Sequence, residues 1–251
     1  MATRAARGFG QYSGTARALE RVGERWALLI VRDLLAGPRR YSDLKSGLPR
    51  IPTNILSDRL KELQEAGVLR RVPTVRGGYE LTPLGRELAP VVDALERWGW
   101  SVLGDAAEGE QVTHDAIAAA LRAAFRPDAA AGMPPTEYVL HVADVSVSAI
   151  VAGRALDVAP VGPGALPQPR RVLPEVAPEA VLELAVAPAG FRDLVAGVRG
   201  AVSVKGAPAG VAILDGGSAL LARFRLTFRI DPVEPPDART GHGAADEASV
   251  A

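Results

Sequence analysis

The stretch that most constrains the fold of this chain is residues 53–66, TNILSDRLKELQEA. Its apolar residues recur at helical spacing and share one face: Ile55, Leu56, Leu60 and Leu63. Thr53 can cap the first turn with its hydroxyl, and Gly67 suits the left-handed position that often ends a helix. The sequence therefore predicts a helix with one buried face and one polar face.

The segments around this helix favour a compact DNA-binding arrangement. Residues 41–48 form a second short amphipathic segment, and two prolines in residues 49–52 disfavour helix between the two. Two β-like runs follow, 68–75 and 79–82, joined by Arg76-Gly77-Gly78, whose glycines allow a tight turn. Helix, turn, helix and hairpin is the order of a winged helix-turn-helix, in which the second helix enters the major groove.

Further helices are expected on both sides of this unit. Residues 15–22 and 26–36 have apolar faces, and Thr82-Pro83 can start a long helix that continues to about Leu103. The long helix has more apolar surface than one small domain requires, so we predict that it pairs with a second subunit. The expected contacts are Leu88, Val92, Leu95 and Trp98. The alternative is that the helix packs only on the core of its own domain.

Charge separates the two halves of the chain, although the net charge is zero. Residues 1–104 carry 17 Lys and Arg against 11 Asp and Glu, and the remainder carries 12 against 18. A basic half fits a module that binds a polyanion, although the excess is modest. The absence of cysteine excludes disulfides and thiolate chemistry. No secretion signal, membrane-length apolar run, metal motif or cofactor motif is visible, so we expect a cytoplasmic protein.

The polar side of residues 53–66 carries groups that can read DNA. Asn54 can bond bidentately to adenine, Lys61 can reach a phosphate or guanine, and Asp58 is either a cytosine reader or a partner of Arg59. Basic residues before the helix would meet phosphates, and Arg76 would lie at the tip of the hairpin. The expected DNA contacts are Arg39, Arg40, Lys45, Thr53, Asn54, Ser57, Asp58, Lys61 and Arg76. For each residue alone, a solvated surface side chain is the alternative.

Residues 12–100 resemble the HxlR family of bacterial winged-helix transcription regulators. The resemblance rests on Gly23 with Trp26, Gly37-Pro38-Arg39-Arg40-Tyr41, Ala66-Gly67, and Tyr79-Glu80-Leu81-Thr82-Pro83-Leu84-Gly85. It implies a homodimer built from the first and last helices of the domain. Members often carry a cysteine near the position of Tyr12 or Ser13, which some use to sense oxidants or electrophiles. This chain has none, so it must sense something else or nothing. Pro52 also stands where the family usually has a small capping residue.

The acidic half reads as a separate α+β domain. We place the first domain at 1–104, a linker at 105–111, the second domain at 112–230 and a disordered tail at 231–251. Thr113 caps a helix at 114–125, and residues 126–135 read as loop. Strands are expected at 136–142, 145–152, 154–161 and 180–187, with a weaker one at 201–206. Helices are expected at 191–197 and within 215–230.

Residues 113–230 resemble the sterol-carrier-protein domain that is fused to some regulators of this family. The matching segments are the strand pair at 137–151, residues 188–197 and Leu220-Leu221-Ala222-Arg223-Phe224. The resemblance implies a sheet covered by helices around an apolar tunnel that binds hydrophobic molecules. The expected lining is Leu140, Val142, Val147, Ile150, Val186, Phe191, Leu194, Leu221 and Phe224. The alternative is that these residues form a solid core.

Three functions remain open from the sequence. The first is a dimeric regulator that responds to an apolar small molecule, for which a secondary metabolite is our preferred class. The second is an enzyme, but the chain has no nucleophile elbow, P-loop, dinucleotide fingerprint or metal cluster. The third is a protein that sequesters a hydrophobic ligand and retains the winged helix chiefly for dimerisation. We predict the first.

Overall fold

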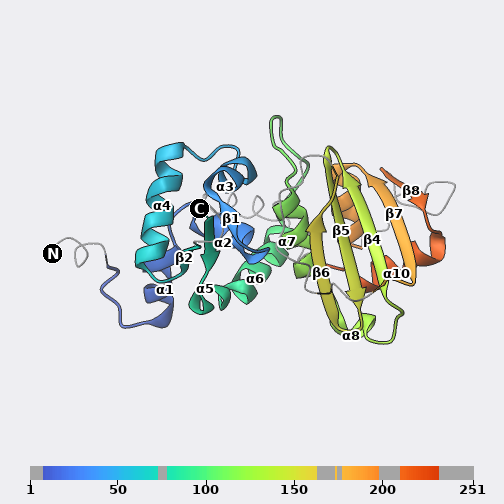
Figure 1. The fold of residues 1–251 in the computed structure, drawn as a ribbon, viewed down its shortest axis with the longest axis horizontal. Coiled ribbons are helices and arrows are strands. Elements are labelled where there is room, and N and C mark those ends of the chain that lie inside the picture. Colours follow the sequence, from blue (N-terminus) through green and yellow to red (C-terminus); the bar gives the residue numbers. More distant parts are fainter. Residues whose placement is uncertain (1–7, 73–77, 163–172, 174–176, 198–209, 232–251) are drawn as a thin grey trace, which may run out of the picture.

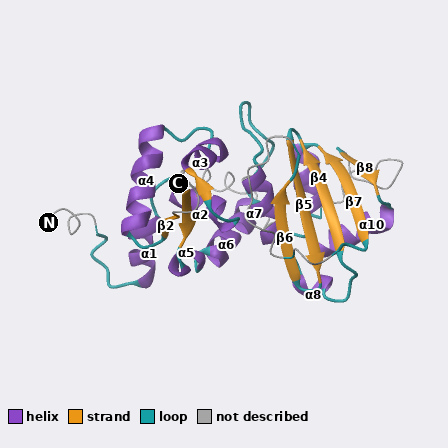
Figure 2. Ribbon diagram, in the orientation of Figure 1, coloured by secondary structure: helices purple, strands orange, loops and turns teal. Residues whose placement is uncertain are grey.

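The computed structural model describes residues 8–72, 78–162, 173, 177–197 and 210–231. The chain forms two halves arranged along the long axis of the molecule (Figure 1). The first half is mainly helical with a small sheet, and the second contains a large sheet with helices behind it (Figure 2). The predicted α+β character of the second half is therefore confirmed.

The first half has the predicted winged helix-turn-helix order. Its elements are α1 (Gly14–Val22), α2 (Ala27–Leu35), β1 (Arg39–Arg40), α3 (Tyr41–Gly47), α4 (Thr53–Glu65), β2 (Leu69–Val72) and β3 (Gly78–Leu81). The three strands form an antiparallel sheet in the order β1-β3-β2. Strand β1 was not predicted, because two residues are too short for a pattern to show. It joins the chain before α3 to the hairpin, with Arg39 opposite Tyr79.

The start of α4 differs from the prediction. Pro52 is the residue before the first turn, and no side chain caps the helix there. The expected capping role of Thr53 is therefore wrong. The end agrees with the sequence: Gly67 has a φ of 74°, the left-handed conformation that glycine adopts without strain.

The predicted long helix from Pro83 is wrong, because the chain forms two helices. These are α5 (Pro83–Arg86) and α6 (Ala89–Gly99). Pro90 has no backbone N–H, and inside a continuous helix its ring would clash with the carbonyl of Arg86. The start is as expected, since the hydroxyl of Thr82 accepts a hydrogen bond from the backbone N–H of Gly85 at 3.1 Å.

The second half forms a five-stranded sheet in the order β6-β5-β4-β7-β8. Strands β4 and β7 are parallel, and the other neighbours are antiparallel. The elements are α7 (His114–Ala124), α8 (Pro127–Ala130), β4 (Thr136–Val142), β5 (Val145–Ala152), β6 (Ala155–Pro160), β7 (Ala180–Val186), α9 (Pro188–Val195), β8 (Val211–Asp215) and α10 (Ser218–Thr227). Helix α8 lies in a region predicted as loop, and β8 was not predicted. The predicted strand at 201–206 and most of the predicted tail lie outside the described residues.

The core of the second half lies between the sheet and helices α7, α9 and α10. The rings of Tyr138, Phe224 and Phe228 meet there with centroids 4.8–5.6 Å apart. Eight of the nine expected ligand-lining residues belong to this core. Ile150 does not, because side chains alternate along β5 and Val147 and Ala149 already point inward. The expectation that Ile150 shares a cavity with the others is therefore wrong.

The two halves are joined by packing. Helix α6 of the first half lies against α7 of the second. Trp100, which falls within the predicted first domain, is buried in the core of the second half, where its ring meets Phe191 edge-on at 6.1 Å. The side chain of Arg97 also reaches the carbonyl of Ala123 at 3.3 Å. The second domain therefore begins, in packing terms, before the predicted linker.

Candidate nucleic-acid interface

Helix α4 presents a continuous polar face to solvent. Leu56, Leu60 and Leu63 are buried beneath it and fix the helix to the core of the first half. The exposed residues on the other side include five of the expected DNA contacts: Thr53, Asn54, Ser57, Asp58 and Lys61. Helix α4 lies at the end of the molecule opposite the large sheet, so that sheet does not cover it (Figure 1).

A tyrosine that sequence reasoning did not select positions the first turn of α4. The hydroxyl of Tyr41, at the start of α3, donates to the carbonyl oxygen of Thr53 at 2.8 Å and lies 3.3 Å from the hydroxyl of Ser57. The Ser57 hydroxyl also donates to the Thr53 carbonyl at 3.1 Å. These bonds fix the angle between the two helices of the helix-turn-helix, and they involve the hydroxyl that we expected to face DNA.

Arg59 does not pair with Asp58, which was one of the two roles expected for Asp58. Arg59 forms ion pairs with Glu24, at 3.6 Å, and with Glu62. The interpretation of Asp58 as the partner of Arg59 is therefore wrong, and Asp58 is exposed on the polar face.

Arg39 is not on the surface, and its predicted contact with phosphate is wrong. Its side chain is 2% exposed, and Nη2 donates to Oδ1 of Asp115 at 2.7 Å. Successive residues of a strand point to opposite sides, so the pairing of β1 with β3 turns Arg39 inward and Arg40 outward. Arg40 is exposed, and Lys45 on α3 is half-buried. Both remain candidates for phosphate contact.

The hairpin supplies cations that the sequence analysis did not include. Arg70 and Arg71 are exposed on β2. Arg70 pairs with Glu80 at 2.6 Å, whereas the guanidinium of Arg71 lies over the ring of Tyr79, 5.4 Å from its centre. Arg76, the expected tip of the wing, lies outside the described residues.

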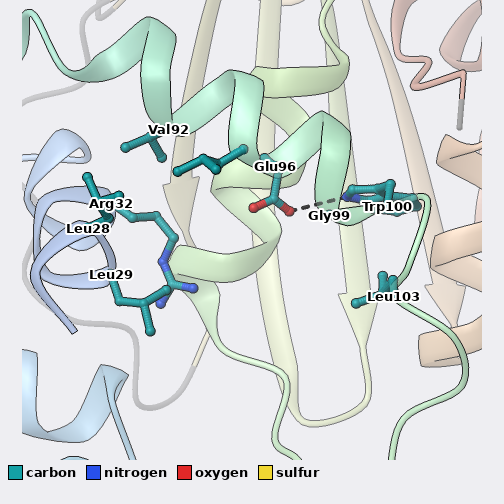
Figure 3. Close-up of a pocket in the computed structure, with 9 residues that line it drawn as sticks. Leu28, Leu29, Arg32, Val92, Glu96, Gly99, Trp100 and Leu103 are labelled. Carbon is teal, nitrogen blue, oxygen red and sulfur yellow. Dashed lines mark hydrogen bonds between the residues drawn. The ribbon is translucent and has the colours of Figure 1, made fainter. Parts of the chain in front are cut away.

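A largely apolar groove lies between α2 and α6 (Figure 3). Its volume is about 250 Å³, and Leu28, Leu29 and Arg32 form one wall. Glu96 accepts a hydrogen bond from the indole N–H of Trp100 at 3.2 Å across the other wall, and burial raises the pKa of Glu96. Leu95 lines the groove and is exposed, and Trp98 is exposed three residues later on α6.

Of the expected dimer contacts, Val92 and Leu88 pack inside the first half. Val92 is buried in this core and also lines the groove, so its expected part in a dimer contact stays a prediction. Leu88 is half-buried against the same core.

Within the described parts of the chain, no group of three or more His, Cys, Asp or Glu side chains could hold a metal ion. Among the same residues, none of the helices has the length and apolar character required to cross a membrane.

The family model for the HxlR-like helix-turn-helix matches residues 21–106. The HTH-type transcriptional regulator YvaP of Bacillus subtilis is 40% identical over 86 residues, which cover 33% of this chain and 80% of YvaP. The chain belongs to the HxlR-like helix-turn-helix family. The matched residues stop at 106, so this membership describes the winged-helix half.

Other relatives of this HxlR-like protein are also named as HTH-type transcriptional regulators. Rv3095 of Mycobacterium tuberculosis is 46% identical over 87 residues, but these span only 54% of its length. The structure of quinone-bound YodB from Bacillus subtilis has 30% identity and a TM-score of 0.31, covering 34% of this chain and 93% of YodB. Regulators with a helix-turn-helix bind DNA and are typically dimeric.

Proposed function

We propose that this protein is a dimeric transcription regulator that binds a specific DNA sequence through α4. The observation that carries the proposal is the exposed polar face of α4, a helix that Tyr41 and three buried leucines hold in place. Asn54 lies in the first turn of this helix, where recognition helices contact base edges. Arg40, on the strand before α3, and Arg71, on β2, are exposed and supply positive charge suited to phosphate contact.

The groove between α2 and α6 supports the dimeric part of the proposal. Leu95 and Trp98 are exposed on α6, and Leu103 is exposed just beyond it. An apolar surface of this kind favours contact with a protein, because burial removes it from water. The occupant that we propose is the same groove and helix of a second copy, as expected for a two-fold dimer.

We also propose that the second half senses an apolar molecule and changes how the dimer presents its recognition helices. Support comes from the resemblance of residues 113–230 to sterol-carrier-protein domains. A hydrophobic-ligand sequestering protein is the alternative. A fluorescent fatty acid should bind the full chain and change its affinity for DNA. Binding of the fatty acid without any affinity for DNA would favour the alternative.

DNA binding is tested by selecting duplexes from a random library with the purified full chain. The expected result is a near-palindromic site with half-sites about 10 bp apart, bound less tightly as salt rises because counterions are released. Equal affinity for the selected duplex and for unrelated duplexes would contradict a specific regulator.

Asn54→Ala should cost about 1–3 kcal/mol in binding the selected duplex and should relax the preference at one base pair. The matched control is Gln64→Ala, which removes a similar exposed amide at the other end of α4. We expect the control to bind like the wild type. Equal losses from both variants would mean that the first turn of α4 does not read bases.

A further inference from the structure

The two halves of the chain share a buried ion pair. Arg39 of β1 and Asp115 of α7 are 76 residues apart in sequence, and their side chains meet at 2.7 Å with 2% and 5% of their surfaces exposed. Strands β2 and β3 form the hairpin, or wing, and β1 pairs with β3, so Arg39 lies in the same sheet as the wing. Asp115 lies in the first turn of the first helix of the second half. The pair therefore links the wing to the second half directly.

A second contact ties the helix-turn-helix to the same region. Arg50 lies in the turn between α3 and α4, and its Nη2 donates to the carbonyl oxygen of Gly109 at 3.0 Å. At the other end of the linker, Arg192 of α9 donates to the carbonyl oxygen of Gly104 at 2.6 Å and pairs with Asp105 at 2.8 Å. The residues between α6 and α7 are thus held by both halves.

The surroundings of the ion pair make its geometry specific. Asp33 of α2 is fully buried beside it, and a side chain in place of Gly47 of α3 would lie within 2.9 Å of Asp33 and 3.4 Å of Asp115. Four elements therefore meet at this point with little free space. Removing one partner of a buried ion pair leaves an uncompensated charge, which is costly.

We propose that Asp115 is a positioning residue for DNA recognition: through Arg39 it fixes the second half against the wing and the helix-turn-helix, so that the two halves present α4 as one unit. This inference rests on the proposed function, because it concerns how α4 meets DNA. It also gives the second half a direct route to the DNA-binding elements. A change of state there can alter DNA affinity only by favouring one arrangement of these elements over another.

The test separates positioning from phosphate contact by measuring DNA affinity across a range of salt concentrations. Asp115→Asn and Arg39→Lys should each weaken binding of the selected duplex by roughly tenfold. Neither should change the salt dependence, because neither residue meets a phosphate. The control is Arg40→Gln, the exposed neighbour, which should reduce the slope of log affinity against log salt by about one.

Arg39→Lys is informative because it keeps the positive charge. If Arg39 contacted phosphate, lysine would largely replace it and Asp115→Asn would leave affinity unchanged or increase it. That combination of results would overturn the proposal. Weakened binding by both variants with an unchanged slope would support it.

Thermal unfolding of the full chain tests the same ion pair without DNA. The wild type should unfold in one transition, and Asp115→Asn should lower the midpoint and separate the transition into two. Asp128→Asn is the control, since it breaks the exposed pair between Asp128 and Arg154 away from the junction. If Asp115→Asn unfolds in one transition with the same midpoint as the wild type, the proposal is overturned even if the protein binds DNA. The expected split transition without any DNA binding would contradict the proposed function, and with it the role in DNA recognition, but would still support the coupling of the two halves through Asp115.

Discussion

At the scale of single residues, Asp33, which lies beside the Arg39–Asp115 ion pair, has a strongly raised pKa. It is fully buried on α2, and one oxygen pairs with Arg32 at 2.8 Å. Burial raises the pKa of Asp33 to about 7, and the nearby carboxylate of Asp115 adds to the rise, whereas Arg32 and Arg39 oppose it. The carboxyl is therefore protonated in the folded protein at pH values where it would be charged in the unfolded chain.

This difference predicts how stability depends on pH. Because the folded state of Asp33 holds its proton up to about pH 7 and the unfolded state releases it near 3.8, the free energy of unfolding should fall as pH rises between these values. Asp33→Asn should remove this contribution. Denaturant unfolding of both proteins at several pH values measures the difference, and Asp58→Asn, an exposed change, should follow the wild type. Parallel curves for wild type and Asp33→Asn would contradict the prediction.

The prediction for Arg39 failed because its partner, Asp115, lies far away in sequence. Arg39 and Arg40 are adjacent cations, and nothing in their local pattern separates them. Only the pairing of β1 with β3 and the arrival of Asp115 give one residue a buried carboxylate and leave the other in solvent. By contrast, the exposure of Asn54 and Lys61 follows directly from helical periodicity, and it was predicted.

At the scale of elements, two threonines near helix starts have different roles. The Thr82 hydroxyl accepts from the N–H of Gly85 at 3.1 Å and donates to the carbonyl oxygen of Gly67 at 2.6 Å, so it caps α5 and also ties it to the end of α4. Thr53 lies inside the first turn of α4, where no side chain caps the helix. We therefore expect the side chain of Thr82 to contribute more to the free energy of unfolding than that of Thr53.

Thr82→Ala should lower the free energy of unfolding by about 1 kcal/mol, the usual cost of a lost cap, and lower the melting temperature by several degrees. Thr53→Ala is the matched control and should change stability by less than about 0.5 kcal/mol. Calorimetry of both variants without DNA measures the two melting temperatures and unfolding free energies. Equal destabilisation by the two changes would show that Thr53 also stabilises its helix.

Helices α1 to α4 and the hairpin of the first half could be predicted, because their apolar spacing and the glycines and prolines at their ends mark them in the sequence, whereas the two-residue strand β1 could not. The break between α5 and α6 was missed because the apolar spacing continues across it, although Pro90 was a local sign of it. Strand β8 was missed for a different reason. It is a five-residue edge strand whose pairing with β7 depends on the fold around it.

At the scale of the whole molecule, Leu95 and Trp98 leave apolar surface exposed on α6, where Leu95 lines the groove. These side chains are 46% and 66% exposed, whereas Trp100, two residues later, is buried in the second half. Trp98 on the last turn of α6 is therefore available to another copy, whereas Trp100, the residue that follows the helix, contacts the second half.

Leu95→Glu should place a charge in the proposed dimer contact and raise the dimer dissociation constant by about tenfold or more. Sedimentation or light scattering at micromolar concentration measures it. The control is Leu226→Glu, an exposed leucine of similar kind on α10, which should leave the mass unchanged. A wild-type protein that is a monomer under these conditions would contradict the two-fold arrangement.

The buried junction also has a consequence for protein engineering. Many regulators are treated as interchangeable modules, so that a sensor from one chain is grafted onto the DNA-binding half of another. Here a cut at residues 105–111 would leave Arg39 without Asp115 and would remove Trp100 from the core around Phe191. A working hybrid would therefore have to carry over the end of α6 and the first turn of α7 together with the rest of the second half, or supply an equivalent carboxylate and indole at the junction between the halves.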